Sequence, residues 1–132
     1  MTYISLSDCN LYGEKLKLCL EIIDKYPELV RAAKKAIADN FPGNETVRYY
    51  FECHFDLLDD EDLLEIFGVK TFAEFDIQKA IEKLGCPDLL FGIEDGEIHF
   101  SADYMISKEY SDGILCVKMD ERLNVTGFSQ ES

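Results

Sequence analysis

The clearest pattern of apolar and polar positions lies in residues 45–67. One side of this stretch is apolar and the other is acidic. Acids are frequent between Arg48 and Lys70, and no Lys or Arg occurs there. Side chains suited to a core recur there at intervals of three and four residues, the period of one helix face: Val47, Tyr50, Phe51, His54, Phe55 and Leu58. The pattern predicts a helix that lies between an apolar core and an acidic surface.

Three other helices are predicted. Residues 27–40 are rich in Ala, Leu, Lys and Glu, carry a proline in the first turn, and end at a Phe-Pro-Gly-Asn sequence. A short helix is expected to begin at Asp59 or Asp60, because carboxylates stabilise a first helical turn. Residues 71–85 begin with a threonine and, three residues later, a glutamate, which is the spacing of a capping box.

Residues 2–23 are predicted to form a β-hairpin. Residues 3–6 would be one strand and residues 10–13 the turn. The second strand is expected at residues 15–22, where every second side chain is apolar and the others are Lys, Cys or Glu. The apolar positions are Leu16, Leu18, Leu20 and Ile22.

From Asp88 onward the apolar period changes from nearly four to two. This alternation predicts four strands, at residues 89–93, 98–106, 114–119 and 125–128. Turn-forming segments separate them, at residues 94–96, 111–113 and 120–124. Connections this short favour antiparallel pairing.

The order of these elements predicts an α+β fold in a single domain, residues 1–132. We expect a two-layer sandwich in which a mostly antiparallel sheet of about six strands, in the order ββ-ααα(α)-ββββ, is covered on one face by helices. The length suits one domain with a substantial core.

The chain is strongly acidic, with 27 acids against 13 bases and a formal net charge of −14. The first 50 residues are formally neutral, because seven acids balance seven bases, so the remaining 82 residues carry the whole charge. Such a surface repels nucleic acid and anionic membranes and speeds encounter with a basic protein. Solubility is an alternative role for the same charge.

Five cysteines occur at wide spacings, without a C-x-x-C pair. An odd number without motif spacing is typical of reduced thiols in a cytoplasmic protein. No apolar run approaches membrane-spanning length, and none at the amino terminus resembles a signal peptide.

The two histidines are predicted to face different directions. His54 belongs to the apolar stripe and is expected to be buried and hydrogen-bonded, whereas His99 shares an outward strand face with Ser101 and Asp103. A shared metal site is therefore not expected, and no cofactor is predicted. Neighbours on that strand face lie ~6.5 Å apart, too far for a nucleophile and its base.

Two segments resemble the uncharacterised bacterial family called "domain of unknown function two thousand and four". They are the Tyr50-x-x-x-His54 helix with its acidic continuation, and the C-terminal segment ADYMISKEYSDGILCVKMDERLNVTGFSQES. The resemblance spans most of the chain and implies a small two-layer α/β sandwich. It implies no activity, so function is argued from the residues alone.

The leading functional hypothesis is a non-enzymatic, cytoplasmic interaction domain that binds a basic protein; one concrete form is an immunity-type protein that neutralises a basic toxin. Two alternatives stay open. One is a small-ligand-binding or metal-dependent enzyme module with a pocket near Tyr50 and His54, and the other is a homodimer joined through its edge strand or open sheet face. Two groups of residues are expected to contact a basic partner. One group is the acids that helix capping does not explain, and the other is the polar face of the second C-terminal strand: Glu52, Asp56, Asp62 and Glu65, and His99, Ser101 and Asp103.

Overall fold

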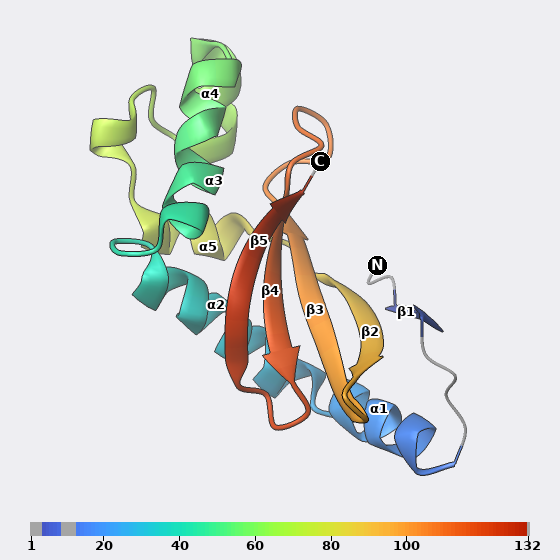
Figure 1. Cartoon of the computed structure of the whole chain (residues 1–132). Helices are drawn as coiled ribbons and strands as arrows, with labels where there is room; N and C mark the ends of the chain where they lie inside the picture. The colour runs from blue at the N-terminus through green and yellow to red at the C-terminus, as the bar shows by residue number, and fades with distance from the viewer. Residues whose placement is uncertain (1–3, 9–12, 132) are drawn as a thin grey trace.

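The computed structural model describes residues 4–8 and 13–131, and these form an α+β fold (Figure 1). One strand precedes a block of helices, and four strands follow it. The elements are β1 (Ile4–Asp8), α1 (Glu14–Asp24), α2 (Tyr26–Asn40), α3 (Glu45–Leu57), α4 (Asp60–Phe67), the short 3₁₀ helix η1 (Phe72–Glu74), α5 (Ile77–Lys83), β2 (Asp88–Glu94), β3 (Glu97–Met105), β4 (Ile114–Asp120) and β5 (Val125–Glu131).

The five strands form a single sheet in the order β1-β2-β3-β4-β5. The last four strands pair with one another antiparallel, as predicted, and β2 and β3 are joined by a tight turn at Asp95 and Gly96, both with positive φ. β1 runs parallel to β2, with Ile4 opposite Leu89. The predicted number of about six strands is wrong, because the described residues form a sheet of five. The parallel β1–β2 pair makes this sheet mixed.

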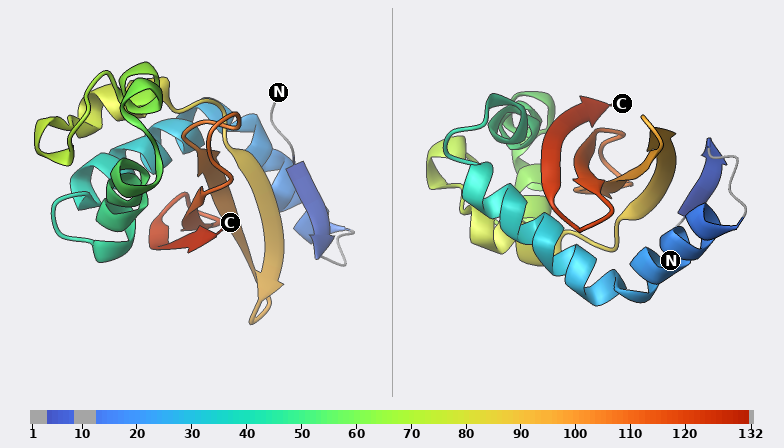
Figure 2. Two further views of the ribbon diagram at one scale, coloured as in Figure 1. Left: turned by 90° about the horizontal axis from the view of Figure 1, so that it is seen from above. Right: turned by 60° about the horizontal axis from the view of Figure 1, so that its bottom comes forward.

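The helices pack against one face of the curved sheet (Figure 2). Alternate side chains of β3 are buried beneath them, including Ile98, Phe100 and Tyr104. The intervening residues of β3 point to the other face, which the predicted alternation had indicated.

The segment predicted as the second strand of an N-terminal hairpin is the helix α1. Cys19 and Ile22 are buried and Leu18 is partly buried, which is helical spacing, whereas Leu20 is 51% exposed. Leu, Lys and Glu favour a helix, and residues 14–21 contain no β-branched side chain, so the alternation of apolar residues here did not indicate a strand. With no hairpin partner from α1, β1 pairs with β2. Residues 2–3 and 9–12 of the predicted hairpin lie outside the described residues.

The helix predicted over residues 71–85 is divided into η1 and α5. Thr71 Oγ1 lies 3.1 Å from Glu74 Oε1, but the side chain of Thr71 makes no capping bond to the backbone. The break lets Phe75 pack on other phenylalanines, and Asp76 then caps α5 by accepting a hydrogen bond from the Gln78 amide at 2.9 Å.

The central helix α3 is confirmed, and Asn44 caps it by accepting a hydrogen bond from the Val47 amide at 3.1 Å. The helix α4 begins at the predicted place, with Asp59 as its cap and Gly68 in the left-handed conformation at its end. Edge-to-face and stacked rings connect α3, α4 and the segment before α5, in a cluster of Phe41, Phe51, Phe55, Phe67, Phe72 and Phe75.

Candidate functional site

Tyr50 on α3 holds both ends of the loop between β3 and β4. Its buried hydroxyl accepts a hydrogen bond from the Ile106 amide at 3.1 Å and donates one to the Gly113 carbonyl at 2.9 Å. Burial raises the pKa of Tyr50 to about 12, so the hydroxyl keeps its proton. The predicted turn at residues 111–113 is therefore part of a longer loop, residues 106–113, with a fixed entrance and exit.

His54 lies one turn further along α3 and is 1% exposed. Its Nδ1 is 2.7 Å from the Tyr50 carbonyl oxygen, which can only accept, so Nδ1 carries the proton and Nε2 is the acceptor. Nε2 lies 2.9 Å from the Ser111 hydroxyl, which in turn accepts a hydrogen bond from the Gly113 amide at 3.1 Å. Burial lowers the pKa of His54, and the imidazole stays neutral at pH 7. The prediction of a buried, hydrogen-bonded histidine is confirmed.

A hollow of about 420 Å³ opens between the end of α3 and the 106–113 loop. Tyr50 does not line it, although His54 does. We call it the loop pocket, and its lining consists of His54, Leu57, Leu58, Lys108, Glu109, Tyr110, Ser111 and Asp112.

Carboxylates surround Tyr110 at the side of the loop pocket. Its hydroxyl donates a hydrogen bond of 2.5 Å to Glu65 Oε2, which ties the loop to α4. This bond, together with the charges of Glu109, Glu65 and Asp62, raises the pKa of Tyr110 to about 12. Partial burial and the neighbouring carboxylates also raise the pKa of Asp62. The fold therefore gathers negative charge from α4 and from the loop in one place.

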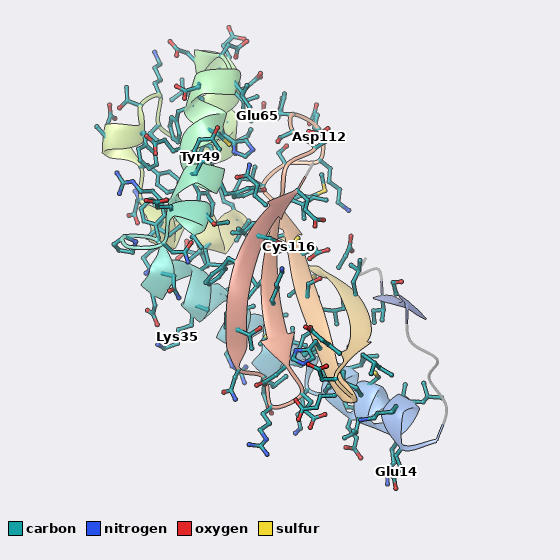
Figure 3. The ribbon with its side chains drawn as sticks, viewed as in Figure 1. Glu14, Lys35, Tyr49, Glu65, Asp112 and Cys116 are labelled. Atoms are coloured by element: carbon teal, nitrogen blue, oxygen red, sulfur yellow. The ribbon has the colours of Figure 1, made fainter. Side chains whose placement is uncertain are left out.

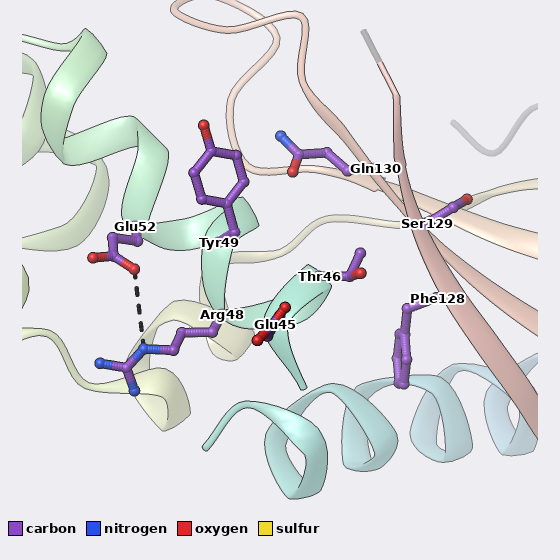
Figure 4. Close-up of a pocket in the computed structure, with 8 residues that line it drawn as sticks. All are labelled: Glu45, Thr46, Arg48, Tyr49, Glu52, Phe128, Ser129 and Gln130. Atoms are coloured by element: carbon purple, nitrogen blue, oxygen red, sulfur yellow. Dashed lines mark ion pairs between the residues drawn. The ribbon is translucent and has the colours of Figure 1, made fainter. Parts of the chain in front are cut away.

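Glu52 and Asp56 lie on the outward side of α3. Glu52 lines a second hollow of about 640 Å³, between α3 and the edge strand β5, where Tyr49 and Gln130 stand on opposite sides (Figure 4). Arg48 Nε is 4.0 Å from Glu52 Oε2, and its guanidinium lies 5.2 Å from the ring centre of Phe72. Arg48, the one Lys or Arg of α3, therefore contacts a carboxylate of the same helix and an aromatic ring.

His99, Ser101 and Asp103 lie on the sheet face that the helices leave open. The structure does not bring them together with the acids of α3 and α4, so the predicted contact residues form two separate groups. Burial raises the pKa of Asp103, as do the nearby charges of Glu131 and Asp88, while hydrogen bonds from Ser101 and Cys116 oppose the rise. Asp103 Oδ1 is buried without a hydrogen-bond partner.

Among the cysteines of the described residues, Cys19, Cys53 and Cys116 are buried and Cys86 is exposed. Cys53 Sγ lies 3.8 Å from His54 Nδ1, but burial raises the pKa of this thiol. Burial and the adjacent Asp103 raise the pKa of Cys116 to about 12. Neither environment favours a reactive thiolate.

The sequence interpretation missed the loop residues, which are Lys108, Glu109, Tyr110, Ser111 and Asp112. The Ser-Asp-Gly sequence signalled a turn, but nothing in it indicated that the loop would reach α3 and α4.

No group of three or more metal-ligating side chains occurs within residues 4–8 and 13–131. In the same part of the chain, no helix has both the length and the apolar character needed to cross a bilayer. Comparison with protein-family models, curated proteins and solved structures gave no match to this chain.

Proposed function

We propose that the protein is a non-enzymatic binding domain for a basic protein. The contact surface, here called the acidic face, comprises the outward sides of α3 and α4 with the adjoining loop. Its predicted members are Glu52, Asp56, Asp62 and Glu65, and the loop adds Glu109 and Asp112. His99, Ser101 and Asp103 lie on another face and are left out of this proposal.

The observation that carries the proposal is uncompensated charge. Residues 45–68 contain eight acids and one base, and that base, Arg48, is engaged by Glu52 and by aromatic rings. Among the described residues, Glu52 pairs with Arg48, whereas Asp56, Asp62 and Glu65 take part in no ion pair. A basic partner would supply the missing counter-charge and would be steered to this face.

Exposed apolar side chains within the acidic face support a binding role over a purely solubilising one. Leu57 is 76% exposed, Tyr49 59% and Leu64 45%, and all three lie on α3 or α4. Interfaces combine apolar or aromatic anchors with a charged rim, whereas a surface that serves only solubility needs no such anchors.

A pair of charge-reversal variants tests the proposal. In the first, Glu52, Asp56, Asp62 and Glu65 are changed to Lys. In the matched control, four exposed acids of α1 and the β2–β3 hairpin are changed to Lys, which alters the net charge equally: Glu21, Asp24, Glu94 and Glu97. α1 begins at Glu14, at the end of the molecule opposite Glu65 and Asp112 (Figure 3).

Each protein would be immobilised and exposed to host lysate at about 50 and 200 mM salt, and retained proteins would be identified by mass spectrometry. We expect a basic protein that the wild type and the control retain at low salt and that the first variant loses. Equal loss from both variants, or retention that does not depend on salt, would contradict the proposal.

An immunity-type protein remains the narrower form of this function. A basic, toxic protein encoded beside this gene would be its expected partner. Co-expression of the two should restore growth, and the charge-reversal variant of the acidic face should fail to do so while the control succeeds.

A further inference from the structure

The loop pocket lies within the acidic face and combines apolar walls with carboxylates. Leu57 and Leu58 come from the end of α3, and Glu109 and Asp112 come from the loop. Glu109 and Asp112 are both exposed, so their charge is available to a ligand.

The shape of the pocket is set before any partner arrives. The Tyr50 hydroxyl bonds to Ile106 and Gly113, and His54 bonds to Ser111, so α3 fixes the loop from its beginning to its end. The bond from Tyr110 to Glu65 holds the middle of the loop against α4. A pre-shaped pocket costs less ordering entropy when a side chain enters it.

We propose that the loop pocket receives an arginine side chain of the basic partner. The aliphatic part of the arginine would lie against Leu57 and Leu58, and its guanidinium would bond the carboxylates of Glu109 and Asp112. The ring of Tyr110 offers a face for the same cation. This inference rests on the proposed function and names the group that anchors the partner.

Charge complementarity favours this occupant over a second copy of the chain. Each copy carries a formal charge of −14, and the pocket itself is bordered by carboxylates, so two acidic faces would repel each other. A neutral apolar ligand would leave those carboxylates without a partner. The neutral imidazole of His54 adds no positive charge to the pocket, and Lys108 is the single base among the lining residues.

Two exposed lining residues permit tests of opposite sign. Asp112→Asn removes an attractive charge and should weaken arginine binding about two- to fivefold, the range for an exposed charge pair. Lys108→Gln removes a repulsive charge and should strengthen it by a similar factor. Neither side chain belongs to the core, so both variants should fold.

The probe is the capped tripeptide acetyl-Gly-Arg-Gly-amide, titrated into labelled protein while amide chemical shifts are recorded. The matched control replaces arginine with citrulline, which has nearly the same shape and no charge. We expect saturable shifts at residues 57–58 and 108–112 with arginine, weak shifts with citrulline, and the two opposite changes in affinity for the variants.

Equal shifts with both peptides, or shifts spread evenly over all acidic surfaces, would overturn the inference. If a basic protein is retained on the acidic face but the peptide perturbs residues elsewhere, the proposed function stands and the arginine pocket does not. If the peptide binds in the pocket but no basic protein is retained, the pocket does bind arginine and the proposed function is wrong.

Discussion

Ser111 donates a 2.9 Å hydrogen bond to Nε2 of His54, although the two residues are 57 positions apart in the sequence. His54 is almost fully buried, and its other ring nitrogen is bonded to the Tyr50 carbonyl. The pair therefore fastens the 106–113 loop to α3. The position of the loop carboxylates beside those of α4 depends on this attachment.

Tyr50→Phe should destabilise the protein by about 1–3 kcal/mol. The change keeps the ring but leaves the Ile106 amide and the Gly113 carbonyl without their partner in a largely buried place. Urea unfolding measures the difference. Tyr49→Phe, at a position that is 59% exposed, is the control and should change the free energy of unfolding by less than about 0.5 kcal/mol. Equal effects would show that the two bonds contribute nothing.

The free energy of unfolding should fall as the pH decreases below about 6.5. The pKa of His54 is lowered in the folded state, so the unfolded chain binds its proton first, and stability present above 6.5 is lost on acidification. The slope should not exceed about 1.4 kcal/mol per pH unit for this single group. Unfolding curves between pH 5.5 and 7.5 test it. His54→Gln should reduce the slope, whereas His99→Gln, on the open sheet face, should leave it in place.

Gly113→Ala should destabilise the protein by about 1 kcal/mol and loosen the loop. A Cβ at this position would lie 3.2 Å from Ser111 Oγ and 3.5 Å from Tyr50 Cε1, so the hydroxyl that bonds His54 would have to move. Gly43→Ala is the control, because a Cβ there meets nothing within 4 Å. Thermal unfolding measures stability, and faster amide exchange at residues 107–113 in the first variant alone would locate the effect.

Asp103→Asn should stabilise the protein at pH 7, by about 1 kcal/mol or less. The carboxylate is partly buried near Asp88 and Glu131, and one of its oxygens has no partner. Burial and these neighbours raise the pKa of Asp103 in the folded state. Its ionisation therefore lowers the free energy of unfolding as the pH rises above about 4, and this loss is smaller at lower pH. The gain from the amide should therefore shrink on acidification towards pH 4. A gain that is the same at both pH values would contradict this explanation.

The local elements were largely predictable because their signals lie within a few residues. The period of the α3 stripe, Asp59 at the start of α4 and the Asp95-Gly96 turn each follow from short-range geometry. The failures occurred where two local interpretations competed. Residues 14–24 alternate like a strand but are mostly helix formers, and residues 71–85 have a capping-box spacing that phenylalanine packing overrides.

The candidate site was predictable only in part. Sequence periodicity indicated that His54 would be buried. It also indicated that the carboxylates of Glu52, Asp56, Asp62 and Glu65 would face outward. The loop residues gave no signal, because Ser111 and Tyr110 acquire their roles from contacts with α3 and α4, which are more than 40 residues away.

The sequence by itself determined the class of fold, the four antiparallel C-terminal strands and the excess of negative charge. These follow from side-chain period, turn residues and composition, which are local or additive properties. Only the tertiary structure decided that β1 pairs with β2 in parallel, and that Tyr50 and His54 hold the β3–β4 loop beside α4. Those outcomes depend on pairing and hydrogen bonding between distant segments, and no periodic pattern specifies which distant partner a backbone group or a buried imidazole will find.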